Sequence, residues 1–353
     1  MDQLKPTADE EFLRRLPKTD LHCHLTGAIP AETAWAIARR NGVPLPAGAT
    51  GPQDLYSFRD PRTFRALRAA LAAALRDERD FAEAAYASLA EPARTENLRY
   101  REMAFDPTDH RKADVPYRTQ LAGLREGIRR AEEEFGVRCR LIPSVNRAES
   151  PDLAVEMVRE VVEELSSDDG LVAGVGLDSA EGAGPPELFA EAFRIAGEAG
   201  LRRTAHACED TGTLAEGPPR SAAVCVDVLG CERIDHGCNL LADPILLDRF
   251  REQRVPFTVC ADTSVPRLTT RRRRNIRAML DAGLRCVLAT GDPAIFGSGP
   301  GDAFAVMGGF LRLDREEAAE LALAGVDAAW LDEAERARLR TDFEREIGRL
   351  TAR

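Results

Sequence analysis

Two histidines separated by a single residue, His22 and His24, are the feature of this sequence that most clearly suggests chemistry. Because alternate side chains of an extended strand share a face, both imidazoles are predicted to point the same way. Of the chain's five histidines, His206 and His236 also stand at the ends of apolar, strand-like runs, and only His110 falls in a polar loop. Crowded neutral imidazoles suit a divalent metal, which engages their lone pairs.

A zinc site built from three imidazoles is the chemistry that this set would support. His22 and His24 from one strand, with His206 from another, leave a fourth position for water, whose pKa a catalytic zinc lowers to about 7. Glu209, three residues after His206, is placed to shuttle a proton to a substrate. His236 could hold the attacking hydroxide by a hydrogen bond.

Each remaining candidate also has an ordinary structural explanation, which the residues leave open. Asp292 could take a hydrogen bond from a ring nitrogen of a substrate, or form the turn before Pro293. Glu209 could cap a helix, and His236 could be a core residue with satisfied hydrogen bonds. Their joint placement at strand ends favours the catalytic interpretation.

The elements that would position these residues alternate between strand-like and helix-like runs, which predicts βαβ units and a parallel sheet. Eight strands are expected, at residues 19–25, 100–106, 137–145, 172–178, 203–208, 233–236, 256–261 and 286–290. This alternation predicts an α/β fold, a (β/α)8 TIM barrel, with residues 1–353 as a single domain and extra helices after residue 300. The functional groups of such a barrel lie at the carboxyl ends of its strands.

Residues 43–80 interrupt the alternation directly after the first strand. The stretch contains Pro, Gly and Asp residues, then an apolar segment at 55–58 and a helical one at 64–75. It could be a lid over a pocket, or a local helical pair that packs on the barrel rim. The sequence leaves both interpretations open.

Composition restricts the partners and the compartment. The formal charge of −11 argues against nucleic acid or a membrane as a general partner. Eight cysteines without a Cys-x-x-Cys pair predict reduced thiols and a cytoplasmic location. Met1 to Pro6 lacks the apolar core of a signal peptide, and no apolar run of about 18 residues occurs. None of the three lysines ends a predicted strand, so a Schiff base is not expected.

Five stretches resemble the adenosine deaminase family of metal-dependent aminohydrolases, and more narrowly its adenine-deaminase-like branch. In family order they are Leu21–Gly27, Val175–Ser179, His206–Glu209, Arg233–Gly237 and Thr290–Pro293. The resemblance covers nearly the whole chain and implies a metal held by His22, His24 and His206. It implies that Glu209 protonates the ring nitrogen next to the attacked carbon, that His236 activates the water, that Asp292 contacts the purine imidazole edge, and that Thr26, Asp178 and Ser179 face the substrate.

The departures from the family pattern concern the same pocket. Gly291 replaces an aspartate that is normally a metal ligand and a partner of the attacking water. Thr26 replaces an acid that faces the substrate, and Cys208, where the family usually has glycine, would bring a thiol close to Glu209. With two negative charges missing, a bound dication would be less neutralised.

The expected function is that of a purine-type deaminase, a hydrolase acting on C–N bonds other than peptide bonds, in cyclic amidines. It would remove an exocyclic amine from an adenine-like base, nucleoside or related heterocycle through a metal-activated water. Zinc or another divalent metal is the expected cofactor, although Gly291 leaves its presence open. The alternative is a metal-free barrel of the same family that binds or transforms a specialised nucleobase-like metabolite. The partner is a small purine-like molecule, and assembly into a homo-oligomer stays open.

Four consecutive arginines, Arg271–Arg274, precede a helix expected at 275–282 and lie on the face of the barrel where the βα loops gather. They could form a solvated loop, or hold an anionic group. Together with the acids lost at Thr26 and Gly291, they predict a ligand that carries a carboxylate, a phosphate or another acidic group. Such a group could fill the coordination position beside Gly291.

Overall fold

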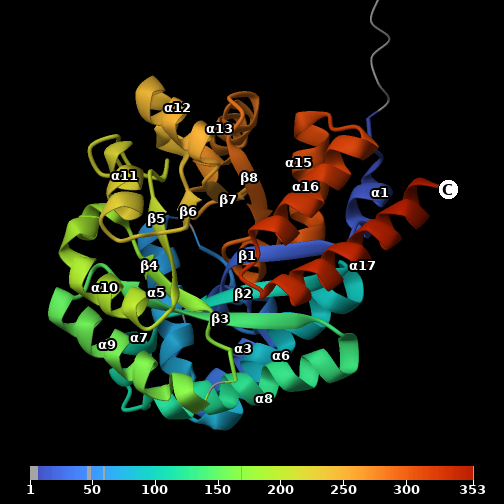
Figure 1. Ribbon diagram of the computed structural model, residues 1–353. Coiled ribbons are helices and arrows are strands. Elements are labelled where there is room, and N and C mark those ends of the chain that lie inside the picture. Colours follow the sequence, from blue (N-terminus) through green and yellow to red (C-terminus); the bar gives the residue numbers. More distant parts are fainter. Residues whose placement is uncertain (1–6, 46–48, 59, 168, 353) are drawn as a thin grey trace, which may run out of the picture.

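The protein folds into a (β/α)8 barrel, seen in a computed structural model that describes residues 7–45, 49–58, 60–167 and 169–352 (Figure 1). Eight parallel strands pair in sequence order to form one sheet. The strands are β1 Lys18–His24, β2 Leu98–Phe105, β3 Arg138–Asn146, β4 Gly174–Asp178, β5 Arg202–Ala207, β6 Arg233–His236, β7 Pro256–Cys260 and β8 Arg285–Ala289. The predicted fold class is confirmed, and both the first and the last residue of each strand lie within two residues of the predicted range.

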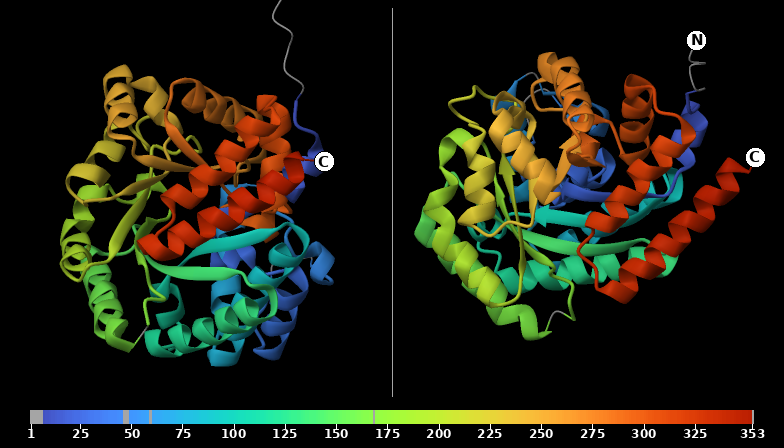
Figure 2. Two further views of the ribbon diagram at one scale, coloured as in Figure 1. Left: turned by 45° about the vertical axis from the view of Figure 1, so that its right-hand side comes forward. Right: turned by 45° about the horizontal axis from the view of Figure 1, so that its top comes forward.

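Helices surround the sheet in both views of Figure 2. They are α1 Glu10–Arg15, α2 Leu25–Ala28, α3 Ala31–Arg40, α4 Pro52–Leu55, α5 Pro61–Ala74, α6 Glu78–Thr95, α7 Pro107–Arg111, α8 Tyr117–Phe135, α9 Pro151–Glu164, α10 Ala190–Glu198, α11 Arg220–Asp227, α12 Pro244–Gln253, α13 Thr269–Asp281, α14 Pro293–Phe296, α15 Pro300–Leu311, α16 Arg315–Ala328 and α17 Glu333–Thr351. Short 3₁₀ turns lie at η1 Leu165–Ser167, η2 Glu181–Ala183, η3 Pro186–Phe189, η4 Cys238–Ala242 and η5 Pro266–Leu268.

The first and last strands are joined through the residue that departs from the family pattern. Gly291 N donates to His22 O at 2.9 Å, and His24 N donates to Gly291 O at 2.8 Å. One residue earlier, the Thr290 hydroxyl donates to Asp20 Oδ2 at 2.7 Å. Gly291 therefore contributes to barrel closure through its backbone and fixes the strand that carries His22 and His24.

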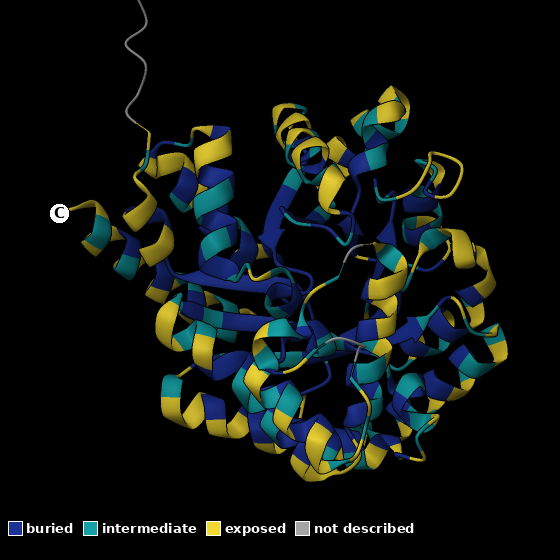
Figure 3. Ribbon diagram, turned by 180° about the vertical axis from the view of Figure 1, so that it is seen from behind, coloured by how far each residue is buried: buried dark blue, intermediate teal, exposed yellow. Residues whose placement is uncertain are grey.

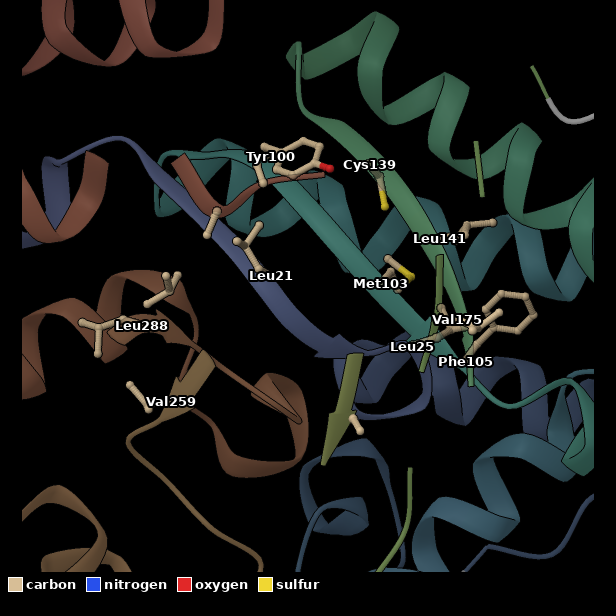
Figure 4. Packing of buried hydrophobic residues seen from close by; sticks show 14 of the residues in the cluster. Leu21, Leu25, Tyr100, Met103, Phe105, Cys139, Leu141, Val175, Val259 and Leu288 are labelled. Carbon is tan, nitrogen blue, oxygen red and sulfur yellow. The ribbon is translucent and has the colours of Figure 1, made fainter. Parts of the chain in front are cut away.

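The strands are buried, whereas exposed residues concentrate on the outer helices (Figure 3). Leu21, Met103, Leu141, Val175 and Leu288 come from five different strands and belong to one buried cluster (Figure 4). Burial of such a side chain contributes roughly 1.5–3 kcal/mol. This packing holds the strand ends in fixed relative positions, as a preorganised site requires.

Two expectations about local structure are wrong. His110 lies in helix α7 and is buried, and its Nδ1 lies 3.1 Å from Ala72 O while its ring packs edge-on against Phe81. Helix α13 begins at Thr269, so Arg271–Arg274 occupy its first turns and do not form a loop before it. Both segments are rich in polar residues, and tertiary partners decide their structure.

All eight cysteines are free thiols and all are buried. Within the described residues, no helix combines the length and the apolar character needed to cross a bilayer. The segment Met1 to Pro6, which carried the argument about a signal peptide, lies outside the described residues.

Candidate metal centre and active site

A pocket of about 390 Å³ lies at the carboxyl ends of the strands and brings most of the predicted site residues together. Its lining includes His22, His24, Asp178, Ser179, His206, Glu209, His236, Gly291 and Asp292. Thr26 does not line it, and contacts a lining residue instead. The pocket occupies the place where barrels of this class carry their functional groups.

Four imidazoles form the floor of this pocket. The ring centroids of His22 and His24 are 5.1 Å apart, and those of His22 and His206 are 4.8 Å apart. His236 completes the group, with its ring centroid 4.9 Å from that of His22. Burial lowers the pKa of His22 to about 3, and burial also lowers the pKa of His206. Both rings are therefore neutral at physiological pH and offer lone pairs.

Two sets of three residues among the described part of the chain have all their ligand atoms within 4.8 Å. One set is His22, His206 and His236, and the other is His24, Asp178 and His206. The predicted set of His22, His24 and His206 takes members from both groups, and it stays a prediction. His206 is common to all three combinations.

Asp178 links two of the imidazoles from the end of β4. Its Oδ1 lies 3.2 Å from His206 Nδ1, and its Oδ2 lies 3.3 Å from His24 Nε2. Burial opposes ionisation of this carboxyl, but the charges of His24 and His206 hold its pKa well below the usual range. The sequence predicted Asp178 only as a substrate contact, whereas its position beside His24 and His206 also makes it one of the groups that could hold a metal ion.

The carboxylates create a strongly negative potential around His24. His24 Nδ1 lies 3.3 Å from Asp292 Oδ2, on the other side of the ring from Asp178. Burial disfavours the imidazolium, but Asp178 and Asp292 outweigh burial and raise the pKa of His24 to about 10. An environment that stabilises an imidazolium this strongly also stabilises a divalent cation.

A buried hydrogen-bond chain supports His22 from behind. The Thr258 hydroxyl lies 3.2 Å from His22 Nδ1 and also donates to Asp235, while Thr204 Oγ1 donates to Asp235 Oδ2 at 2.9 Å. Supporting hydrogen bonds of this kind fix the tautomer and orientation of a metal-binding imidazole. Sequence reasoning quoted Asp235 as part of a motif but assigned it no function.

Glu209 does not stand alone, because a buried arginine holds it. Arg272 Nη2 lies 2.8 Å from Glu209 Oε1, and Arg272 Nε donates to Asp210 Oδ1 at 2.7 Å. Asn275 Nδ2 also donates to Asp210, at 2.8 Å. Burial opposes ionisation of Glu209, but Arg272 outweighs it and lowers the pKa of this carboxyl. Arg272 of the arginine run is thus the ion-pair partner of Glu209. This pairing was not predicted from the sequence.

His236 faces Glu209 from the end of β6, with Nε2 3.7 Å from Glu209 Oε1. Burial and the neighbouring imidazoles hold its pKa well below the usual value, so the ring is neutral. Its backbone has φ +77°, and Ser179 and Cys208 also have positive φ at strand ends. Such conformations cost of order 1–3 kcal/mol each and cluster at functional sites.

The thiol of Cys208 is not a site group. Its Sγ donates to the carbonyls of Pro218 and Pro219, at 3.3 Å each, and it does not line the pocket. The thiol that the sequence placed near His206 and Glu209 is therefore directed to the backbone of Pro218 and Pro219 and is not part of the pocket lining. The backbone at Cys208 has φ +58°, which explains why glycine suits this position.

The position of the Asp292 carboxylate depends on Gly27. A Cβ at Gly27 would meet Asp292 Oδ1 at 2.0 Å, so any larger residue would displace this carboxylate. Gly291, at φ +70°, is different, because a Cβ there would meet its nearest heavy atom, Cys260 Sγ, at 3.4 Å. The space beside Gly291 therefore has room for a Cβ, although the left-handed backbone there strains any residue other than glycine.

Helix α5 of the insert forms one wall of the pocket. Phe64, Arg65 and Arg68 line it, and Phe64 stacks on Phe296 with the ring planes 16° apart. The insert therefore contributes to the pocket and does more than pack on the rim. No site residue was predicted in this helix. The spacing of its apolar residues predicts which face is buried, but it does not predict where the arginine side chains point.

The residues present fit a divalent metal. His22 Nε2 and His206 Nε2 face each other at 3.0 Å, and His24 Nε2 is buried without a hydrogen-bond partner among the described residues. Asp292 Oδ1 is buried and unsatisfied in the same way. Imidazole nitrogens with a nearby carboxylate are ligands that zinc accepts. The site can therefore hold a divalent metal.

Comparison with known proteins decides the family. The family model described as adenosine deaminase matches residues 17–345. The chain belongs to the adenosine deaminase family. A curated adenine deaminase of Streptomyces coelicolor is 40% identical over 97% of this chain and 98% of its own length. One from Hahella chejuensis is 34% identical, over 94% of this chain and 96% of its own length.

Solved structures of this family superpose closely on the chain. An amidohydrolase from Burkholderia ambifaria, determined with bound zinc, has a TM-score of 0.87 and 32% identity, covering 97% of this chain and 93% of its own. An adenine deaminase from Arthrobacter aurescens has a TM-score of 0.84 and 33% identity, covering 96% and 100%. The family resemblance inferred from the five sequence stretches is confirmed.

Proposed function

We propose that the protein is a zinc-dependent aminohydrolase that replaces the exocyclic amine of an adenine-like purine by oxygen and releases ammonia. The observation that carries the proposal is the convergence of four imidazoles with Asp178, Glu209 and Asp292 in one buried pocket. The relatives called adenine deaminase, matched over nearly their whole length, support the same reaction.

His22, His24 and His206 are assigned as the metal-binding residues, with Asp178 orienting two of them. Zinc, when bound, lowers the pKa of water to about 7 and makes hydroxide available at neutral pH. Neutral His236 accepts a hydrogen bond from the attacking water and holds it against the purine carbon.

Proton transfer is assigned to Glu209, which starts as a carboxylate beside Arg272. It takes a proton from the attacking water and passes it to the ring nitrogen next to the attacked carbon. The second proton of that water leaves with the amine, as ammonia. Asp292 accepts a hydrogen bond from the purine imidazole edge, and Ser179 faces the substrate from the end of β4.

The substitution Glu209→Gln tests these roles. The amide keeps the size and some hydrogen bonds of the glutamate but cannot carry a proton, so we expect ammonia release from adenine-type substrates to fall by roughly 10²–10⁴-fold. Glu232→Gln, an exposed change beside Arg202, is the matched control and should keep full activity. Ammonia release that is unchanged in Glu209→Gln would remove Glu209 from the mechanism.

The alternative, a metal-free barrel that binds or transforms a nucleobase-like metabolite, is supported by one observation. An imidazolium at His24 between Asp178 and Asp292 would balance charge in the site without a metal. A measurement of the metal content separates the two functions, because only the aminohydrolase predicts an activity that rises in proportion to the bound zinc.

A further inference from the structure

Arg68 of helix α5 places a cation at the substrate pocket and leaves most of its hydrogen-bond donors unused among the described residues. Arg68 Nε donates to Thr26 Oγ1 over a long 3.4 Å. Its nearest approaches to Asp178 and Asp292, at 3.9 and 3.7 Å, are longer than hydrogen bonds. The side chain is 26% exposed and lines the pocket. A guanidinium has five N–H donors, so most of them are available to a ligand.

Each of the two aspartates beside Arg68 lies closer to an imidazole than to the guanidinium. Asp178 uses its oxygens for His24 and His206, at 3.3 and 3.2 Å, and Asp292 uses Oδ2 for His24. A metal bound at these imidazoles would draw the carboxylates further toward the pocket floor. Both acids therefore lie closer to an imidazole than to Arg68, although Asp292 Oδ1, which has no hydrogen-bond partner among the described residues, faces the guanidinium at 3.7 Å.

Thr26 makes this cation available. Its hydroxyl lies beside the Arg68 guanidinium and carries no charge. An acidic side chain in the same place would form an ion pair with Arg68 and would repel an anionic substrate. The threonine therefore leaves the positive charge of Arg68 uncompensated on this side of the pocket.

Arg65 extends the same cationic wall. It lies three residues before Arg68 on α5, is exposed, and lines the same pocket. Residues three apart on a helix are neighbours on one face. Phe64 of the same helix also lines the pocket and stacks on Phe296, which adds an apolar surface to the lining.

Three of the four arginines of the run 271–274, by contrast, already have partners. Arg272 binds Glu209 and Asp210, Arg273 lies 2.8 Å from Asp262, and Arg271 donates to the backbone of Asp210. The acidic residues of the opposite wall also have partners or reduced charge. Glu216 accepts from Thr213 N, and burial raises the pKa of Glu181 to about 7.

We propose that Arg68, assisted by Arg65, binds an acidic group on the substrate, so that the preferred substrate is an adenine-type compound with a phosphate or carboxylate. The inference rests on the proposed function of the same pocket and adds its substrate class. Guanidinium groups bind both anions through paired hydrogen bonds. The charge of the substrate is thus recognised by the insert helix, and the reacting amine by the strand ends.

Equilibrium binding tests the inference independently of turnover. Calorimetric titrations of the zinc-loaded Glu209→Gln protein would compare adenosine, AMP and adenosine 5′-carboxylate. We expect AMP or the carboxylate to bind at least tenfold more tightly than adenosine, with an advantage that shrinks as salt rises. The arm with the larger advantage identifies the acidic group. Equal affinity for all three compounds would overturn the inference.

Substitutions then assign the effect to Arg68. In the same background, Arg68→Gln should weaken binding of the preferred anion at least tenfold and leave adenosine binding within twofold, and Arg65→Gln should have a smaller effect in the same direction. Arg62→Gln, an exposed arginine of the same helix outside the pocket, is the matched control. Thr26→Glu should reverse the preference, toward neutral adenosine. Loss of binding to all compounds alike in Arg68→Gln would contradict the inference.

The two proposals fail in different ways. If the protein releases ammonia from adenine and adenosine but binds neutral and anionic compounds equally well, with or without Arg68→Gln, the proposed substrate class is refuted. The proposed aminohydrolase activity then remains. Arg68-dependent binding of anions without ammonia release from any purine by the zinc-loaded wild type would support the substrate class and refute the aminohydrolase.

Discussion

Replacing Arg272 by methionine should destabilise the protein strongly, although its neighbours on α13 tolerate the same change. The Arg272 side chain is 2% exposed and holds Glu209 and Asp210 at 2.8 and 2.7 Å. Loss of one partner of a buried pair costs about 3–5 kcal/mol. We therefore expect a loss of about 3–5 kcal/mol.

Urea unfolding at pH 7 measures this loss, with Arg273→Met as the matched control. Arg273 pairs with Asp262, but its side chain is 26% exposed, and a pair at such a site contributes about 0–1 kcal/mol. A double-mutant cycle of Arg272→Met with Glu209→Gln should show coupling of at least 1 kcal/mol. Equal losses for the two arginine variants, or additivity in the cycle, would refute the view that Arg272 is the buried partner of Glu209.

Two further predictions concern Gly291 and the buried His110. Gly291→Asp should slow zinc loss to a chelator, because it adds a carboxylate at the position where the family has a metal ligand. A Cβ there would lie 3.4 Å from Cys260 Sγ, and aspartate is one of the residues that adopt a positive φ such as +70°. Zinc loss as fast as in the wild type would contradict this prediction. Burial lowers the pKa of His110 to about 4, so below pH 6.5 the unfolded state binds more protons and stability falls. Between pH 7 and pH 5 the contribution of His110 to the free energy of unfolding should fall by about 2 kcal/mol. His110→Phe should remove this part of the pH dependence in urea titrations. A pH dependence equal to that of the wild type would contradict the prediction.

The sequence predicted the barrel and the motif residues because both depend on local signals. Strands alternate with helices, and the short polar stretches that follow the strands must lie at one end of a parallel barrel. His22, His206, Glu209, His236 and Asp292 were found in this way, and the structure brings all five into one pocket. Their chemical roles remain predictions.

Long side chains that reach the pocket from helices could not be predicted. Arg68 and Arg272 arrive from α5 and α13, and where a guanidinium ends depends on packing between segments far apart in the sequence. The arginine run was placed before a helix expected at 275–282, whereas helix α13 begins at Thr269, although cations near a helix start oppose its dipole. Ion pairs with Asp210 and Asp262 outweigh that local cost.

Metal content measured together with ammonia release tests the central claim most directly. Protein purified, stripped with a chelator and titrated with zinc should release ammonia from an adenine-type substrate in proportion to bound zinc, and activity should saturate at one zinc per chain. Protein that binds no zinc, or that releases no ammonia from neutral or acidic adenine compounds when fully loaded, would contradict it.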